Sequence, residues 1–340
     1  MTPSLDNMPD VVVNLILEHL DFTSMETLRK VNWSLRNSIE NQSNHGIKEI
    51  DIRFDPEKIV IWIDGTTRIQ YENHDKGTSI FCHVDLNSED FIQKYSRNSN
   101  FLDVFFRDLE RYFLRNQRVI LKEFCVYCDY FDGNQMEDRE DYNIFLRALR
   151  QFFEAGTKAI KAKNVSIGLT NQEDLMNILS CVDSQLLSKV FIVNELKKET
   201  KLEIDEFVKN WKQCIHLKIP RFFVSPTILK NISHLAEFEI VLRHVEAEDL
   251  MILKTQFMIS NTLKNAKIYY ESPEEKELVR PFGNVYYKDF GLGMPFKNWF
   301  FSYPNQQYAL SISAYNFCRK QIRFEKISID SVREGLLIPE

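Results

Sequence analysis

The pair of residues best spaced to bind a metal or exchange electrons is Cys125 and Cys128, in the sequence Cys-Val-Tyr-Cys. This spacing occurs in zinc knuckles and in redox-active thiol pairs. A zinc site needs a second pair of ligands nearby, and a redox pair needs a helix N-terminus that lowers the pKa of a thiol. Neither signal adjoins this pair, and in the strand that the surrounding residues predict, side chains three positions apart lie on opposite faces. We therefore expect neither metal nor redox chemistry here, and no cofactor.

The other residue types that do chemistry form no catalytic or nucleotide-binding motif. The seven histidines include no His-x-x-x-His pair of the kind that binds zinc on a helix. Gly291 and Gly293 lack the third glycine and the strand-to-helix context of a phosphate-binding loop, and no Gly-x-Ser-x-Gly motif is present. The acidic run at residues 137–141 is typical of the first turn of a helix. We therefore expect a protein without catalytic activity.

Composition and charge favour a folded protein that binds other proteins. The chain has 340 residues, of which 44% are hydrophobic and 27% charged, enough for about two domains. Its formal net charge of −6 gives no general attraction to nucleic acids or anionic membranes. The six cysteines lack a disulfide-framework spacing, and the N-terminus has no basic stretch followed by an apolar run. We expect a cytoplasmic or nuclear protein that binds neither nucleic acid nor a membrane.

The N-terminal segment predicts short helices with an unusually wide apolar surface. Asn7 is a good N-cap for a first helix that has Pro9 in its first turn and ends near Leu20. Residues 23–26 have the Thr-x-x-Glu capping-box pattern, and two more short helices follow with a break near Asn32. At 100° per residue the apolar side chains of the first helix cover about 240° of its circumference, whereas a surface helix needs a stripe little over about 100° wide.

This excess apolar surface has to be covered, because three helices of this size make too small a core to be stable alone. Two explanations follow from the residues. The first helix is either the central core helix of a larger domain or a helix that packs against another protein.

A resemblance to a known family favours the second explanation. The order of apolar and basic residues in this segment resembles the F-box, in particular the F-boxes of nematode proteins. The matching residues are Met8, Pro9, Val12, Ile16, Leu17, Leu20, Asp21, the run Leu28-Arg29-Lys30-Val31, and Leu35-Arg36. Met8 replaces the more common leucine, which conserves volume, and Val11 stands where an acidic residue is frequent, which is expected to weaken the contact with a partner.

The resemblance implies a partner. F-boxes bind the Skp-type adaptor of a cullin-RING ubiquitin ligase, which explains a first helix that is more apolar than an internal core requires. The residues that the resemblance places in the adaptor contact are Met8, Pro9, Val12, Ile16, Leu17, Leu20, Leu28, Val31 and Leu35. No substrate-binding residue is identifiable from the sequence.

Residues 45–118 change to a period of two, which predicts a meander of short strands. Apolar residues alternate at 47–54, 59–63, 69–71 and 80–84, and Asp64-Gly65 and Lys76-Gly77 between these runs are typical of hairpin turns. A helix at 101–114 and a strand at 119–127 follow. We interpret residues 45–118 as a segment that joins two domains.

Residues 119–340 alternate strand and helix patterns. A helix is predicted at 138–155, with Gly156 as its left-handed cap. Strand-like runs then recur, and their centres are Ile167, Phe191, Leu217, Ile240 and Ile268. Separations of 23 to 28 residues fall in the range of leucine-rich-repeat solenoids, although the repeat signature is absent. We expect an α+β or α/β protein in which a three-helix F-box at 5–44 precedes a degenerate leucine-rich-repeat-like solenoid; a two-layer α/β domain is the alternative.

The same stretch resembles the FTH domain, a nematode domain of unknown function found behind F-boxes of this type. The segments that carry this resemblance are Asn164–Ile167, Glu173–Leu179, Asn210–Cys214, His216–Leu217, Ser233–Leu235 and Ala247–Leu250. They cover about residues 120–290. The glutamate that the family has before its Gln-Trp-Lys triplet is absent, so we expect Trp211 to pack rather than bind. The resemblance implies recruitment of a protein without naming it.

The leading hypothesis is therefore the substrate-recognition subunit of a Skp–cullin–F-box ubiquitin ligase, with an unknown protein as its target. Two alternatives stay open. One is an adaptor-bound scaffold or decoy that delivers no substrate. The other is a transcription regulator with a helix-turn-helix at residues 9–40, which the excess of five acidic over three basic residues there disfavours.

Overall fold

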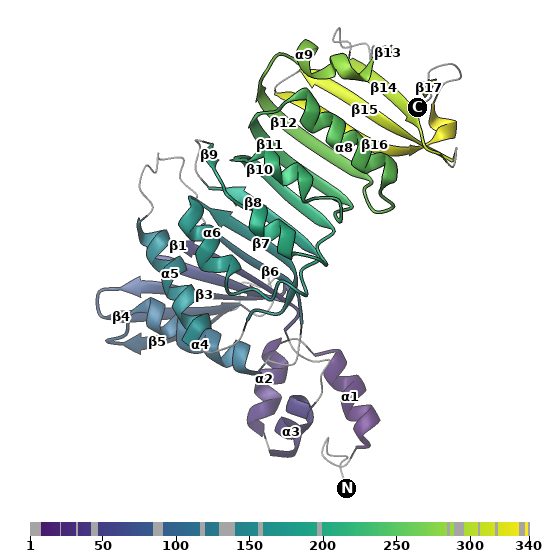
Figure 1. Ribbon diagram of the computed structural model, residues 1–340. Helices are drawn as coiled ribbons and strands as arrows, with labels where there is room; N and C mark the ends of the chain where they lie inside the picture. The colour runs from purple at the N-terminus through teal and green to yellow at the C-terminus, as the bar shows by residue number, and fades with distance from the viewer. Residues whose placement is uncertain are drawn as a thin grey trace. The chain divides into compact units, whose positions relative to one another are not determined.

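The computed structural model in Figure 1 is an α+β structure in which strands dominate. It describes residues 8–20, 22–31, 33–41, 47–83, 91–115, 120–128, 140–155, 159–195, 199–283, 286–288, 296–304, 307–316, 319–332 and 337–338. The chain forms two compact units: the first contains Met1–Gly168 and Asp174–Asp183, and the second contains Leu169–Glu173 and Ser184–Glu340. The expectations for Asn7, Asp21, Asn32, Gly156 and Gly291–Gly293 lie outside the described residues.

The chain of the first unit begins with helices α1 (Asp10–Glu18), α2 (Phe22–Val31) and α3 (Trp33–Asn41). Pro9 is the N-cap of α1 rather than part of its first turn, and its carbonyl oxygen accepts hydrogen bonds from the N–H groups of Val12 and Val13 at 2.8 and 3.1 Å. Pro9 cannot sit one residue further into the helix here, because its backbone is extended (ψ 143°). The helix also ends at Glu18, earlier than predicted.

The second helix differs from its prediction in the same way. It begins at Phe22, so Thr23 lies inside the helix and the predicted Thr-x-x-Glu capping box is wrong. A capping box requires the threonine to have the extended backbone of an N-cap, and a residue within the helix lacks it. The break near Asn32 is consistent with the structure, since α2 ends at Val31 and α3 begins at Trp33.

The sheet of the first unit is mixed and has the strand order β7-β6-β1-β2-β3-β4-β5. The first three strands pair in parallel, and β1 to β5 form an antiparallel meander. Their bounds are β1 (Glu49–Asp55), β2 (Lys58–Ile63), β3 (Thr67–His74), β4 (Gly77–His83), β5 (Phe91–Arg97), β6 (Leu121–Cys128) and β7 (Ala162–Leu169). Because β6 pairs with β1, the predicted segments 45–118 and 119–340 share one sheet.

The turn between β2 and β3 is where the sequence predicted it. Asp64, Gly65 and Thr66 join the two strands, and φ angles of 52° and 68° at Asp64 and Gly65 are left-handed, as a primed hairpin turn requires. The Asp64 carboxylate also accepts hydrogen bonds from the N–H groups of Lys48 and Glu49 at 2.7 and 2.9 Å. This turn therefore holds the start of β1 as well as its own two strands. The turn between β3 and β4 is Asp75-Lys76 rather than the predicted Lys76-Gly77, because Gly77 already pairs with His74.

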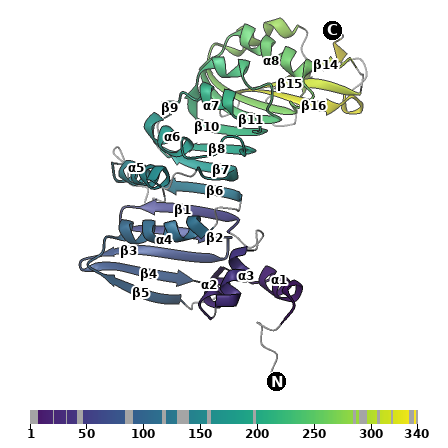
Figure 2. The same ribbon diagram turned by 60° about the horizontal axis from the view of Figure 1, so that its bottom comes forward.

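Helices α4 (Phe101–Arg115) and α5 (Glu140–Ala155) cover one face of this sheet (Figure 2). Both present aromatic side chains to it. Phe145 stacks on Phe54 of β1 with ring centres 4.7 Å apart, and Phe105 meets the edge of Tyr71 of β3 at 5.6 Å. Within the described residues, the opposite face of the sheet carries no helix.

The second unit also contains a mixed sheet. Strands β8, β10, β11 and β12 pair in parallel, and β12, β16, β15 and β14 continue the sheet in antiparallel order. The strand bounds are β8 (Lys189–Asn194), β9 (Thr200–Lys201), β10 (His216–Val224), β11 (Glu237–His244), β12 (Asn265–Ser272), β13 (Tyr286–Lys288), β14 (Phe296–Ser302), β15 (Tyr308–Asn316), β16 (Lys320–Ser328) and β17 (Leu337–Ile338).

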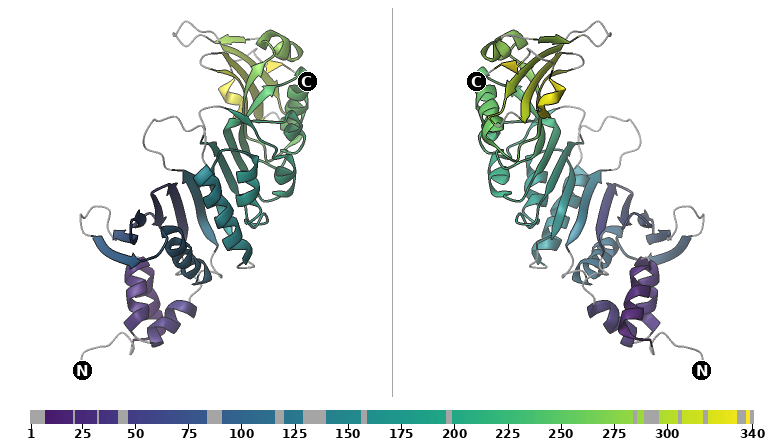
Figure 3. Two further views of the ribbon diagram at one scale, coloured as in Figure 1. Left: turned by 90° about the vertical axis from the view of Figure 1, so that its left-hand side faces the viewer. Right: turned by 90° about the vertical axis from the view of Figure 1, so that its right-hand side faces the viewer.

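The helical segments between the parallel strands cover one face of this second sheet, as Figure 3 shows. They are α7 (Asp205–Asn210), the 3-10 helix Pro226–Lys230 and α8 (Ala247–Ile259), and α9 (Glu275–Val279) follows β12. α6 (Gln172–Leu179) lies between β7 and β8 in the chain. All five predicted strand centres lie in strands, namely β7, β8, β10, β11 and β12. The antiparallel strands after residue 285 were not predicted, and neither was β5.

Candidate functional site

The inner faces of the N-terminal helices close on one small apolar cluster. Its buried members are Val13, Leu17, Leu35 and Ile39. The partly buried side chains of Met8, Leu20 and Leu28 pack against them. This cluster is small for a core, and it leaves much of the apolar surface of the helices outside it.

The outer face of α1 is apolar as well, and it is exposed in the described chain. Val11 and Leu15, one helical turn apart, are 78% and 59% exposed, and Val12 beside them is also exposed. At 100° per residue these three side chains fall within about 100° of one another, on the side opposite Val13 and Leu17. α1 thus has a buried apolar face and an exposed one.

A second exposed apolar group lies where α2 meets α3. Val31, the last residue of α2, is 63% exposed, and Trp33, the first residue of α3, is 74% exposed. Tryptophan side chains bury a large area when covered and are enriched in protein interfaces. We call Val11, Val12, Leu15, Val31 and Trp33 the outer apolar set.

The charged residues at the α2–α3 junction are basic. Arg29 and Lys30 lie in the last turn of α2, where positive charge stabilises the helix dipole. The Arg36 Nε donates a hydrogen bond to the carbonyl oxygen of Arg29 at 3.3 Å and so ties α3 to the end of α2. A partner that covers Val31 and Trp33 therefore also meets positive charge.

The nine residues predicted to contact an adaptor separate into inner and outer positions. Leu17 and Leu35 are only 1% and 4% exposed, so they have almost no surface to offer a partner and instead hold the helices together. The exposed ones are Pro9, Val12 and Val31, and the half-buried ones are Met8, Ile16, Leu20 and Leu28.

Three residues of the outer apolar set were absent from that prediction: Val11, Leu15 and Trp33. From the sequence, Val11 was expected to weaken the contact, whereas in the structure it is the most exposed large apolar residue of the chain's described part. The signal for Val11 and Leu15 was present in the wide apolar arc of the helix, because that arc must include positions opposite the buried face. Trp33 had no periodic signal, since it begins a new helix.

A second candidate surface is the helix-free face of the sheet in the second unit. Its side chains form charged pairs across neighbouring strands. His216 of β10 lies 3.4 Å from Glu237 of β11, and the Lys267 Nζ of β12 lies 3.8 Å from the Glu239 carboxylate of β11. The series continues on β16 through Arg323, which donates to Asn265 at 3.3 Å and to Glu325 at 2.8 Å.

Aromatic rings lie among these charges. The Arg319 guanidinium sits 5.6 Å from the ring centre of Tyr269, and the Arg243 guanidinium sits 4.8 Å from that of Phe223. Burial and the neighbouring Glu239 raise the pKa of Tyr269. We call this combination of paired charges and rings on β10, β11, β12 and β16 the charged face. It suits recognition of a polar protein surface.

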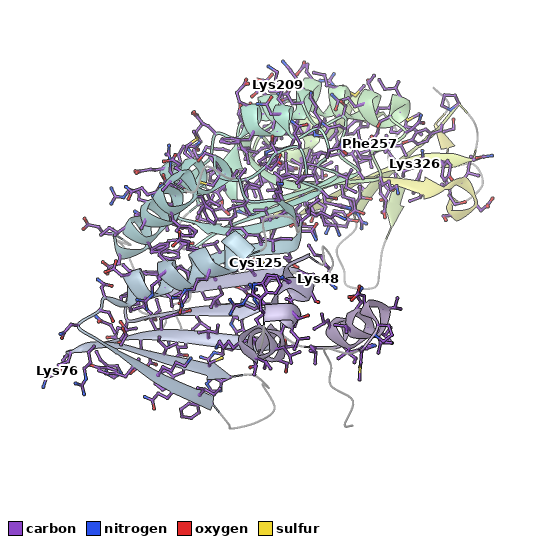
Figure 4. The ribbon with its side chains drawn as sticks, turned by 90° about the horizontal axis from the view of Figure 1, so that it is seen from below. Lys48, Lys76, Cys125, Lys209, Phe257 and Lys326 are labelled. Carbon is purple, nitrogen blue, oxygen red and sulfur yellow. The ribbon has the colours of Figure 1, made fainter. Side chains whose placement is uncertain are left out.

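The thiol pair Cys125 and Cys128 lies on opposite faces of β6, because Cys128 is in register with Phe54 and Cys125 with Asp51. Burial, followed by the negative charge of Glu123, raises the pKa of the Cys125 thiol, the reverse of what a reactive cysteine needs. Figure 4 labels Cys125 in the sheet. In the part of the chain that the structure describes, no group of three or more His, Cys, Asp or Glu residues is placed to hold a metal ion.

An open depression of about 370 Å³ lies on the helix-free face of the first unit, over β1, β2 and β6. Trp62 and the Asp51–Arg53 ion pair, with 3.1 Å between nitrogen and oxygen, contribute to its lining. Glu49 at its edge binds Lys122. Charges paired in this way stabilise the sheet surface, and they do not form the nucleophile-and-base arrangement of a hydrolytic site.

Among the described residues, no helix has the length and apolar content required to cross a membrane. A comparison with curated proteins finds no match to this chain. Two family models do match: the F-box domain over residues 5–45, and the FTH domain over residues 143–285. The chain therefore combines an N-terminal F-box domain with a C-terminal FTH domain.

Proposed function

We propose that this chain is a substrate-recognition subunit of a Skp–cullin–F-box ubiquitin ligase and that it binds the Skp-type adaptor through its N-terminal helices. The F-box match supports this role, because F-box proteins are generally non-catalytic adaptor subunits. The observation that carries the proposal is the outer face of α1, where Val11 and Leu15 are exposed although the inner face of the same helix is already buried.

The contact surface that we propose is the outer apolar set together with Pro9 and the half-buried Met8, Ile16, Leu20 and Leu28. Leu17 and Leu35 act through the position of the helices, because they lie in the internal cluster. Burying one large apolar side chain contributes about 1.5–3 kcal/mol, whereas association costs at least about 4 kcal/mol. Each member of the outer apolar set therefore contributes to affinity when it is covered, and several must be covered together to offset that cost.

We further propose that a target protein binds the strand-rich remainder of the chain. The domain division that goes with this is an F-box at 5–44, a joining meander at 45–118 and an FTH-type module at 119–340. The regular spacing of β8, β10, β11 and β12, with helical segments between these parallel strands, supports a leucine-rich-repeat-like solenoid within this module. The charged face lies on the side of these strands that such solenoids use for binding.

In this role the chain performs no chemistry. It raises the effective concentration of the target's lysines near a ubiquitin-charged enzyme that the cullin holds. Such ligases work in the cytoplasm and nucleus, which is where we propose that this chain acts.

The test compares adaptor binding by full-length wild type and by a Val11→Asp, Leu15→Asp double variant, using purified Skp-type adaptor in co-purification and in biolayer interferometry. Two carboxylates in an apolar contact are expected to weaken the affinity by about a hundredfold or more. The matched control is Ile259→Asp at the end of α8, because Ile259 is 76% exposed and lies outside the F-box.

Loss of binding in the double variant, with normal binding by the Ile259 variant, supports the proposed surface. Binding by the double variant that equals that of the wild type contradicts it. Equal loss in both variants would show that the contact is not specific to the F-box helices.

A further inference from the structure

Strand β5 forms an edge of the sheet in the first unit. It pairs with β4 along all seven of its residues, from Phe91 opposite His83 to Arg97 opposite Gly77, without a register shift. In the described residues no strand pairs with its other side. An edge of this kind presents backbone donors and acceptors to any extended chain that comes beside it.

The hydrogen-bond pattern shows which residues of β5 face outward. The Asn98 N–H donates to the Lys76 carbonyl at 2.9 Å, so Asn98 and Lys76 lie at a hydrogen-bonded position between the strands. In an antiparallel pair, bonded and non-bonded positions alternate. The residues at even positions of β5 therefore bond to β4, and the backbone groups of the odd positions Phe91, Gln93, Tyr95 and Arg97 point away from it.

The side chains of β5 are more exposed than those of any other strand with a described burial pattern in this unit. Phe91, Ile92 and Tyr95 are each about half exposed. Phe91 extends an aromatic group, with ring centres 5.7 Å from Phe81 and 5.4 Å from His83. Apolar side chains therefore lie on both faces of the edge, ready to flank the side chains of an added strand.

Proteins usually protect such an edge with a proline, a bulge or charged side chains, lysine above all. The charged residues of β5 are Lys94 and Arg97, which restrict pairing to a strand of matching charge. β5 has no proline and pairs regularly with β4. The two strands also approach closely, because a Cβ added to Gly77 would clash with the Ser96 carbonyl oxygen. The edge is thus regular, as a strand that accepts another strand needs to be.

Among the described residues of this edge, the charges are mostly positive. Lys94 and Arg97 lie on β5, and Lys76 lies at the tip of the neighbouring hairpin, where Figure 4 shows it pointing away from the sheet. Asp75 is the one carboxylate among the described residues 75–99, and no ion pair within the described chain involves Lys94 or Arg97. An extended partner with carboxylates matches this edge in charge.

We propose that the edge of β5 binds an extended acidic segment of a partner protein by strand addition. The backbone groups of Gln93, Tyr95 and Arg97 supply the hydrogen bonds, and Phe91, Ile92 and Tyr95 contact alternate apolar side chains of the segment. Lys94 and Arg97 select carboxylates. This site is distinct from the F-box helices and does not depend on adaptor binding.

The test selects binders of the full-length chain from a random decapeptide library and counter-selects them against a Gln93→Pro variant. Gln93 is the apt position because its N–H points outward, so proline removes an edge donor and spares the ladder to β4. Peptides that distinguish the two proteins are expected to alternate apolar residues and to carry net negative charge. N-methylation of every second amide of such a peptide should weaken binding about tenfold or more.

A Lys94→Glu, Arg97→Glu variant serves as the second test, because exposed charges can be reversed without disturbing the fold. Its affinity for the selected peptides should be lower than that of the wild type by about tenfold or more. The segment between β4 and β5 contains Asp85, Glu89 and Asp90, which stay unchanged in every variant. The proposal is overturned if no peptide distinguishes wild type from Gln93→Pro, if N-methylation has no effect, or if charge reversal leaves the affinity unchanged.

Discussion

Helices α1 and α5 are both rich in apolar residues, yet they differ in how many of their apolar side chains stay exposed. α5 has 16 residues and one exposed large apolar side chain, Ile144, because its apolar stripe packs on the sheet. α1 has nine residues and exposes three, Val11, Val12 and Leu15, although its other face is buried. The difference shows that apolar content alone does not mark a core helix. We expect a partner-binding helix to have an apolar arc so wide that part of it stays exposed after the rest of the same chain has packed against it.

The largest expected effect separates stability from binding. Phe145→Ala in α5 removes a buried ring stacked on Phe54 and is expected to lower the free energy of unfolding by about 3–5 kcal/mol. Adaptor affinity at a temperature where the variant is folded should stay unchanged. Urea unfolding followed by circular dichroism measures the first quantity and biolayer interferometry the second. A Phe145 variant that keeps its stability but loses adaptor binding would break the distinction between the two helices.

Chemical labelling of a buried cysteine tests how well the core of the second unit excludes solvent and reagents. Cys214 is fully buried, its thiol donates to the His216 carbonyl at 3.3 Å, and burial raises its pKa to about 12. Because the thiolate is the reactive form, iodoacetamide should modify Cys214 about a hundredfold or more slowly in the folded protein than after urea unfolding. Mass spectrometry of the labelled peptide gives the rate. Fast labelling without denaturant would mean that this core is not closed.

Trp33 provides a test of whether the adaptor covers the outer apolar set. Its exposed ring should become buried when the adaptor binds, so its fluorescence should shift to shorter wavelength, and a Trp33→Phe variant should lack that shift. Trp33→Ala is expected to weaken adaptor binding about thirtyfold, as for a tryptophan in an interface, and to leave the unfolding free energy within about 0.5 kcal/mol. A stability loss of several kcal/mol in Trp33→Ala would place this ring in an internal core instead.

The smallest expected effect concerns pH. Burial, together with the positive charge of Lys212, holds the pKa of His234 below its usual value of 6.5. The unfolded chain therefore binds more protons than the folded one when the pH falls below about 6.5, so the second unit should lose stability on acidification. His234→Asn should reduce this loss between pH 7.5 and 5.5 in urea unfolding. An identical pH dependence in wild type and variant would show that His234 does not contribute.

The sequence predicted much of this molecule because its periodic signals are strong. The hairpin at Asp64-Gly65, helices α4 and α5, and the five strands centred on Ile167 to Ile268 all lie where the pattern placed them. Strand β5 was missed because Gln93-Lys94 interrupts its apolar residues, as is common in an edge strand that no layer covers.

The candidate site could be predicted only in outline. The apolar arc of α1 predicted that some residues face a partner, but which ones stay exposed depends on how α1 and α3 pack. That packing buried Leu17 and Leu35 and left Val11 and Leu15 outside. Caps were also mispredicted: Pro9 precedes its helix instead of lying in the first turn, and Thr23 lies inside its helix instead of preceding it. The tertiary contacts of a helix outweigh such local patterns.

Hydrogen exchange of the full-length chain, with and without a purified Skp-type adaptor, tests the central claim most directly. The account predicts slower amide exchange in peptides that cover α1 and the α2–α3 junction, and unchanged exchange in α5 and in strands β10, β11 and β12. Protection confined to the strand-rich units, with α1 unaffected, would contradict the assignment of the outer apolar set as the adaptor-binding surface.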